Sequence, residues 1–250
     1  MKSVAIISLS MPSADIAFCL KYFALYYLSS VRFCTFMQDF ITYLDKTESA
    51  VKNIFDGIEY YKKILAPIKG AIYVGGGANK QEAEKNFNQW AEKNQDALNA
   101  SIEAQKKFFE ESFAMATLCG AVLQIAAKAI ECFSALDHVP ENLLPIIGDS
   151  KAIRKFCIGR EVKGLPIGLI IYAGRNQHTH YNDAKLSAAN TAIFSKLAEV
   201  PGHPDIADPA LDLRRPNILS LADNITFILG WRTYRDYRMD MESLLNTKPD

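Results

Sequence analysis

The chain has 250 residues, of which 49% are hydrophobic and 22% are charged, a composition typical of a soluble globular protein. Its 28 Lys and Arg residues equal its 28 Asp and Glu residues, so no overall field attracts nucleic acid or an anionic membrane. A site for either partner would have to come from a local cluster of charge.

The cysteines argue against a disulfide framework and against a zinc site. They are odd in number, widely spaced and contain no C-x-x-C pair: Cys19, Cys34, Cys119, Cys132 and Cys157. We expect buried, reduced thiols in a cytoplasmic protein.

Three apolar stretches bear on targeting and on membranes. The N-terminal stretch predicts no signal peptide, because Pro12 and Asp15 follow its short apolar run. Residues 16–37 and 113–130 are long and apolar, but charged residues interrupt both. They favour buried helices over membrane spans, so we expect no membrane partner.

Helical periodicity dominates the first half of the chain. Apolar spacing predicts a helix over about 13–44 and a second over 48–65. The glycine run at 75–77 predicts a flexible turn, since it lacks the lysine and serine of a phosphate-binding loop. Residues 79–136 predict one long bent helix, or two helices that meet near Ser112. Its apolar second part is the expected central helix of a bundle.

The second half of the chain predicts shorter helices. A loop at 140–148 leads to a short helix over 150–157, capped by Asp149 or Ser150. Residues 167–174, IGLIIYAG, could form a strand, but no second strand is predicted to pair with it, so we expect a helix.

Two more helices complete the prediction, one over 184–198, capped by Asn182 or Asp183, and one from Pro216 to about 245. The predicted class is therefore all-α. We expect residues 1–78 to form an N-terminal helical extension packed on the core, and residues 79–250 to form the bundle that carries the site.

The densest polar chemistry lies in the segment that follows IGLIIYAG. Arg175, Asn176 and His180 suit metal-independent cleavage of a phosphodiester, because a histidine near neutral pKa can move the proton of a 2′-hydroxyl. A guanidinium can hold two phosphate oxygens and stabilise charge that builds on phosphorus. The alternative is that these side chains satisfy buried carbonyl groups at a helix junction.

Nearby histidines allow further interpretations. His178 and His180 with Asp183 could bind a metal, but other ligands lie far away in the sequence, so we expect no metal and no cofactor. His178 either assists at the cleft or faces solvent.

A basic segment precedes the motif. Residues 150–175 carry six basic residues against Glu161, a net charge of about +5 that would attract a phosphate backbone. A solvated basic face is the alternative reading. The candidate RNA-binding residues are Lys151, Arg154, Lys155, Arg160 and Lys163.

The last predicted helix interleaves aromatic and basic residues. Trp231, Tyr234 and Tyr237, each followed by an arginine, could stack on single-stranded RNA. Their spacing of three residues is more typical of a stripe that packs into a core or a dimer interface.

The stretch GRNQHTH resembles the R-x4-6-H motif of the HEPN superfamily, whose members are helical bundles and include many metal-independent ribonucleases of toxin–antitoxin and phage-defence systems. Residues 158–245 look similar to a single-motif bacterial branch of it. The resemblance implies catalytic Arg175 and His180 supported by Asn176, and a homodimer whose two motifs face one RNA-binding cleft. It also admits a catalytically inactive HEPN-fold module that binds a partner or a nucleotide.

One subgroup of the superfamily is regulated by an antitoxin, a nucleotidyltransferase that adenylylates a tyrosine two residues after the histidine. Here Tyr181 follows His180 directly, and Asn182 occupies the second position. The sequence departs from that subgroup at this point, which leaves Tyr181 as an assisting residue at the cleft.

Overall fold

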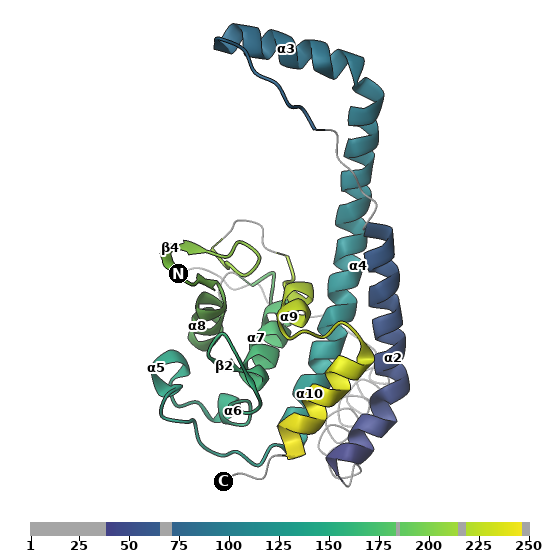
Figure 1. The fold of residues 1–250 in the computed structure, drawn as a ribbon. Helices are drawn as coiled ribbons and strands as arrows, with labels where there is room; N and C mark the ends of the chain where they lie inside the picture. Colours follow the sequence, from purple (N-terminus) through teal and green to yellow (C-terminus); the bar gives the residue numbers. More distant parts are fainter. Residues whose placement is uncertain (1–38, 66–71, 184–185, 215–218, 247–250) are drawn as a thin grey trace, which may run out of the picture.

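The computed structural model describes residues 39–65, 72–183, 186–214 and 219–246. Its longest element is the helix α4 (Gln95–Phe133), against which the other large helices pack (Figure 1). Helix α2 (Phe40–Leu65) lies along one side of α4, and α7 (Ile167–Thr179) and α9 (Ala222–Ile228) lie on another. Helix α10 (Tyr234–Asn246) packs mainly on α2. The all-α class is confirmed.

Shorter elements cover the outer side of α7. They are the helices α5 (Leu144–Ile147), α6 (Lys151–Arg154) and α8 (Ala188–Leu197), and two antiparallel hairpins. The hairpins join β1 (Glu161–Val162) to β2 (Leu165–Pro166), and β3 (Glu199–Val200) to β4 (His203–Ala207). Neither hairpin was predicted, because strands of two to five residues are too short to show a period of two.

The core forms where α2 and α7 bury their apolar faces against α4. On α2, Leu44, Val51 and Phe55 recur on one face and are buried, as are Leu123 and Ile130 of α4. The Tyr43 hydroxyl donates to the Ile125 carbonyl at 2.9 Å and links the two helices. Helix α2 therefore shares one core with α4 and α7.

The upper part of α4 projects beyond the body and carries α3 (Lys80–Lys93) across its end (Figure 1). The two helices meet at Asn94, not near Ser112 as predicted. The Asn94 backbone N–H donates to the carbonyls of Trp90 and Ala91, and its side chain donates to Trp90 at 2.7 Å. These bonds end α3, and α4 then runs unbroken through Gly120.

The glycine run at 75–77 is folded against α3. A Cβ at Gly77 would lie 2.4 Å from the Ala83 nitrogen, and the Asn86 side chain donates to the Gly76 carbonyl at 2.8 Å. Tyr73 packs edge-on against Phe87. The run therefore contacts α3 at Gly76 and Gly77, and its flexibility stays a prediction.

Three predicted helix boundaries are also wrong. Helix α2 continues through residues 44–48, where a break was predicted, and the rest of the first predicted helix lies outside the described residues. Helix α8 begins after Ser187, whose side chain accepts from the Asn190 N–H, instead of after residue 183. The last predicted helix is divided into α9 and α10, with Gly230 between them at a φ of 76°.

Helix α4 is long and apolar enough to cross a membrane by length and composition alone. Half of its most apolar window is buried inside the protein, as in the core helix of a soluble domain, so this is weak evidence for a span. Its packing against α2, α7 and α9 is that of the predicted central helix.

The thiol prediction holds at two positions. Cys119 and Cys157 are buried free thiols, and burial raises the pKa of each to about 11. Cys132 is disulfide-bonded, so the expectation of a reduced thiol is wrong there. Sequence spacing did not signal this bond because a disulfide depends on Cα separation in the fold. Cys19 and Cys34 lie outside the described residues.

Candidate functional site

Helix α7 carries the Arg175–His180 motif on its last two turns. It starts after Pro166, and its glycines allow close packing, since a Cβ at Gly168 would lie 2.3 Å from the Phe156 carbonyl and one at Gly174 2.8 Å from Ile225. The prediction that IGLIIYAG is helical is confirmed. Because α7 is wedged between α4, α8 and α9, the position of the motif is set by the core.

The Arg175 side chain points back along α7 toward the end of α4. Its Nη2 donates to Glu131 Oε1 at 2.9 Å, and its guanidinium lies 5.9 Å from the centre of the Tyr172 ring. Two more cations surround the same glutamate, since Lys128 lies 3.5 Å from Oε2 and Lys155 donates to the backbone carbonyl at 2.6 Å. The three cations around Glu131, two at its carboxylate and one at its backbone carbonyl, leave an excess of positive charge at this point.

Arg175 retains hydrogen-bonding capacity within this cationic cluster. Its side chain is 22% exposed, and its Nε is buried without a hydrogen-bond partner among the described residues. Glu131 accepts a hydrogen bond only from Nη2, so this pair leaves the other N–H donors of the guanidinium unused. An anion that reached the cluster could accept from them.

His180 ends α7 and faces solvent. Its Nδ1 lies 2.8 Å from Asp183 Oδ2, and the two side chains are 53% and 56% exposed. With Asp183 ionised, Nδ1 carries the proton and Nε2 presents a lone pair to the outside. This arrangement, in which a carboxylate orients a solvent-accessible imidazole, suits proton transfer to or from a bound substrate.

Within the single chain, Arg175 and His180 share no contact among the described residues. The guanidinium lies back toward Tyr172 and Glu131, whereas the imidazole lies past the end of the helix next to Asp183. The structure therefore places two half-sites on one helix, a cationic cluster and a histidine–carboxylate dyad. The motif led us to expect these two side chains side by side, whereas each has its own separate partners.

Asn176 points toward α8 and away from both half-sites. Its Nδ2 lies 3.4 Å from Asn190 Oδ1, a long hydrogen bond, and buried Asn190 in turn donates to the Ala173 carbonyl at 3.2 Å. Asn176 thus helps to join α7 to α8 in this arrangement.

His178 lies between α4 and the segment before α9. Its Nδ1 is 2.7 Å from the Ser220 hydroxyl oxygen, and a Cβ on Gly120 would lie 2.2 Å from its Nε2. Partial burial lowers the pKa of the imidazole, which favours the neutral form. His178 is half-buried and packs between helices, a position that was not considered from the sequence.

A metal site at the two histidines is not supported by the geometry. His178 contacts Ser220 whereas His180 contacts Asp183, so the two imidazoles face different surroundings. The described residues contain no group of three or more metal-binding side chains.

Tyr181 is half-buried directly after the helix.

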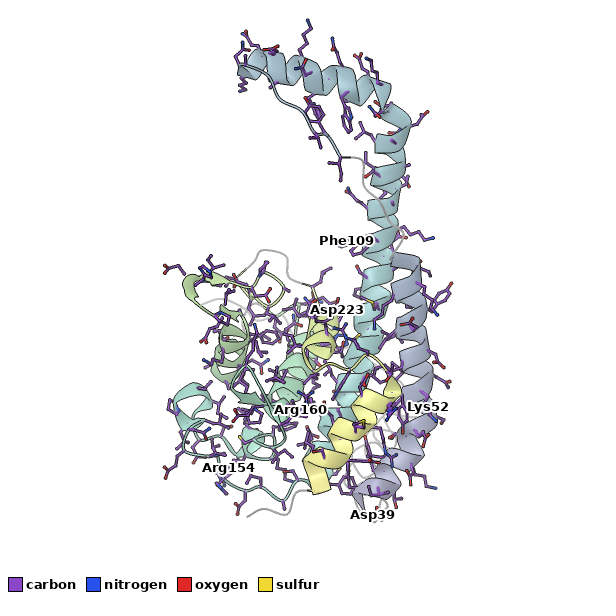
Figure 2. The ribbon with its side chains drawn as sticks, in the orientation of Figure 1. Asp39, Lys52, Phe109, Arg154, Arg160 and Asp223 are labelled. Atoms are coloured by element: carbon purple, nitrogen blue, oxygen red, sulfur yellow. The ribbon has the colours of Figure 1, made fainter. Side chains whose placement is uncertain are left out.

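The predicted basic segment is distributed over the surface. Arg154 pairs with Asp149 at 2.8 Å and Arg160 pairs with Asp240 at 2.7 Å, at separate positions labelled in Figure 2. Lys151 is exposed and forms no ion pair with another described residue. Of this group, only Lys155 reaches the cluster that holds Arg175.

Lys163 lies in the turn of the first hairpin, and its side chain binds backbone carbonyls at the end of α8. Its φ is 51°, a left-handed conformation, and its ammonium donates to the carbonyls of Leu197 and Glu199. A cation at this place satisfies carbonyl groups at a helix C-terminus, which explains why a lysine occupies a strained turn position.

The aromatic residues near the C-terminus belong to the core, as the spacing favoured. Trp231 and Tyr237 are buried and pack edge-on, with ring centres 5.1 Å apart, and Tyr234 lies against Tyr237. The Trp231 ring nitrogen donates to Asp240 at 2.8 Å.

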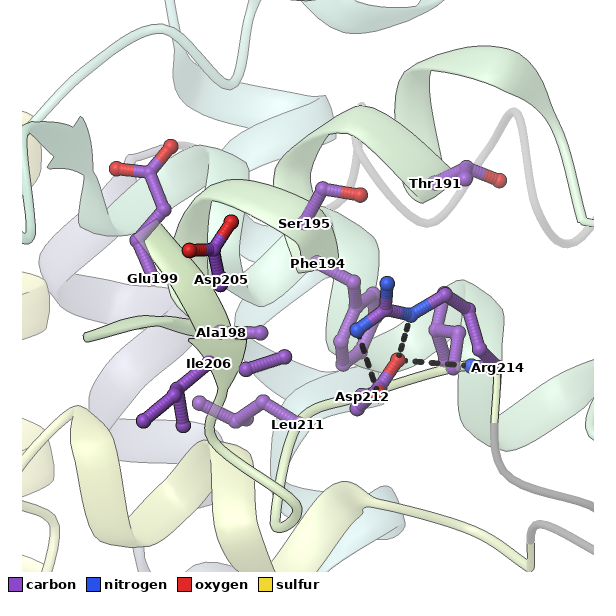
Figure 3. A pocket seen from close by; sticks show the side chains of 12 residues that line it. Thr191, Phe194, Ser195, Ala198, Glu199, Asp205, Ile206, Leu211, Asp212 and Arg214 are labelled. Atoms are coloured by element: carbon purple, nitrogen blue, oxygen red, sulfur yellow. Dashed lines mark hydrogen bonds and ion pairs between the residues drawn. The ribbon is translucent and has the colours of Figure 1, made fainter. Parts of the chain in front are cut away.

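The cavities near α8 lie away from the motif. One of about 430 Å³ is bounded by α8 and β4, and its rim carries Glu199, Asp205 and the Asp212–Arg214 ion pair (Figure 3). Another, of about 520 Å³, is lined by Lys163 along with Glu199. The acidic groups on the first rim disfavour a phosphate ligand there.

Three residues around the motif were not predicted as site residues for phosphodiester cleavage. Asp183 was considered only as a helix cap and a metal ligand, although its position three residues after His180 could have signalled the pair. Lys128 and Glu131 lie 44 or more residues before Arg175, and nothing in the local sequence links them to it.

Comparison with known proteins adds no relative: no family model, curated protein or solved structure matches this chain.

Proposed function

We propose that the protein is a metal-independent endoribonuclease in which the His180–Asp183 dyad moves protons and the cationic cluster around Arg175 binds phosphate. The observation that carries the proposal is the solvent-accessible imidazole with a carboxylate on Nδ1 and Nε2 left for a substrate. The resemblance of the motif to the HEPN superfamily points in the same direction.

In the proposed reaction, Nε2 of His180 takes the proton of a ribose 2′-hydroxyl. The 2′ oxygen attacks the adjacent phosphorus, the bond from phosphorus to the 5′ oxygen breaks, and the leaving oxygen takes a proton from water. The hydroxide that remains is neutralised by the proton that the His180 imidazolium releases. The products are a 2′,3′-cyclic phosphate and a 5′-hydroxyl end. Asp183 holds the imidazole in the reactive tautomer and stabilises the imidazolium that forms.

Arg175 has a different role from the one that the motif first suggested. Because its guanidinium lies at Glu131 and not at His180, it would hold a neighbouring phosphate of the same strand with help from Lys155. This arrangement favours a polynucleotide over a mononucleotide, since two successive phosphates must be engaged. Lys128 adds positive charge to the same place.

The test is cleavage of single-stranded RNA by the purified protein in the presence of EDTA, with the product ends identified. His180→Ala should abolish cleavage, and Asp183→Asn should lower kcat by about 10-fold or more, because it removes the orienting carboxylate. Arg175→Ala should raise KM more than it lowers kcat if the arginine binds a remote phosphate.

A matched control is provided by His138, whose Nδ1 lies 3.2 Å from Asp137 in a second exposed histidine–carboxylate pair. His138→Ala should leave cleavage unchanged. Activity that is lost in EDTA, or that survives His180→Ala, would contradict the proposal.

A second candidate is a non-enzymatic interaction module, and the projecting arm of α3 and upper α4 favours it because it exposes large apolar side chains. Expression separates the two functions. A ribonuclease should slow growth of the host cell, and Arg175→Ala should relieve that effect, whereas a module should be harmless in both forms.

A further inference from the structure

One face of α4 changes from buried to exposed along its length. In the body this face meets α7: Gly120 lies against His178, Ala127 is fully buried, and Glu131 pairs with Arg175. Residues spaced by seven and four along a helix share a face. The same face therefore continues upward through three large apolar residues, Ile102, Phe109 and Phe113.

We call these three residues the arm stripe. Ile102 is 49% exposed, Phe109 64% and Phe113 50%, and none of them belongs to the buried core or packs against it. Phe109 lies at the base of the arm in Figure 2, above the part of α4 that α9 covers. The stripe begins where the cover provided by α7 and α9 ends.

We propose that a second copy of the chain covers the arm stripe, so that two molecules associate through the upper part of α4. A symmetric contact uses the same surface of both copies and buries both stripes at once. This inference does not depend on RNA cleavage.

The area of the stripe fits such a contact. From the exposed fractions and the usual size of these side chains, the three residues expose about 300 Å² of apolar surface. Roughly 57% of the area of an interface is apolar. If the stripe supplies this apolar share, each copy buries about 500 Å² in total. Two copies would bury about 1,000 Å², which is near the lower limit for a specific interface and predicts a concentration-dependent dimer.

The pattern around the stripe also suits pairing with itself. Lys106 lies within the stripe, four residues after Ile102 and three before Phe109, and pairs with Glu103 at 2.7 Å. Its aliphatic stem can add apolar area to the contact while its ammonium stays at the edge with Glu103. The pair is neutral, so no single-sign field opposes association.

Sedimentation velocity of the full chain from low to high micromolar concentration tests the proposal. The wild type should shift from monomer to dimer, and Phe109→Glu should weaken the dimer by at least about tenfold, as expected for loss of a central apolar anchor. The matched control is Tyr60→Glu, which places the same charge at an exposed aromatic position on α2 and should leave the dimer intact.

At a concentration where the wild type is monomeric, circular dichroism should show the same helix content and melting temperature for Phe109→Glu and wild type, because the Phe109 side chain packs against no core residue. A wild type that stays monomeric throughout, or a dimer that resists both Phe109→Glu and Phe113→Glu, would overturn the inference. RNA cleavage is measured separately, and His180→Ala should leave the dimer unchanged, so either proposal can fail alone.

Discussion

Gly120 of α4 lies against the imidazole of His178 on α7. Glycine usually destabilises the interior of a helix, yet α4 continues straight through Gly120. The missing side chain is what allows the imidazole to lie against the helix backbone. At this position glycine allows close packing of α7 on α4, although glycine lowers the stability of a helix interior.

We expect Gly120→Ala to lower the free energy of unfolding by about 1–3 kcal/mol, because a Cβ there would lie 2.2 Å from His178 Nε2. Urea denaturation followed by circular dichroism measures the change. Gly76→Ala is the control, since a Cβ there has no neighbour within 4 Å, and it should change stability little.

The double variant Gly120→Ala with His178→Ala isolates the contact. The two substitutions should together cost less than the sum of the single effects, because removal of the imidazole makes room for the new methyl group. Additive effects would show that the close approach is relieved elsewhere in the fold.

At the level of elements, the sequence predicted those helices whose apolar pattern is long. Helix α7 was correctly predicted because its apolar run had no strand to pair with, and α4 was expected as the central helix. The α3–α4 junction was misplaced because the break is made by one asparagine, Asn94, whose bonds to Trp90 leave no strong sequence signal.

A long-range contact explains why the turn of the first hairpin was not predicted. The hairpin β1–β2 turns at Lys163 and Gly164, both with positive φ, and a lysine is unusual at such a position. Its reason lies 34 residues away, at the carbonyl of Leu197. Local propensity alone could not have predicted a turn that is stabilised by a distant helix end.

The separation of α9 from α10 leads to a prediction about Gly230. Its φ of 76° disfavours any residue with a Cβ, although the space around it is open. Gly230→Ala should therefore cost about 1–2 kcal/mol of stability, and Gly230→Asn should cost less because asparagine tolerates the left-handed region better. Thermal melts of the two variants give the comparison. Equal effects would mean that backbone conformation is not the cause.

Across the whole molecule, the candidate site depends on residues that a sequence window does not contain. The basic segment was counted as strongly positive, but its arginines meet acids on other elements, such as Asp240 of α10 for Arg160. Conversely, Lys128 of α4 lies near Arg175 because both side chains pair with Glu131. The motif could be identified from the sequence, whereas its charge environment required the fold.

Stability should also differ between the body and the arm. Helix α3 has no buried residue, and upper α4 buries little, whereas lower α4 buries Val122, Leu123 and Ala126 completely. Helix stability in proteins comes mainly from packing of an apolar face, so an uncovered helix opens locally at low free energy. One continuous helix is therefore expected to contain two regions of very different protection.

Hydrogen–deuterium exchange of the Phe109→Glu variant, which keeps the arm uncovered, measures this difference directly. Amides of residues 96–112 should exchange at least about 100-fold faster than those of residues 119–130, since local opening of the arm leaves the core intact. In the wild type, raising the protein concentration should slow exchange in residues 96–112 and leave the core unchanged, because a second copy covers only the arm. Equal protection along α4 in the variant would mean that the upper helix is stabilised by something other than packing of the arm stripe.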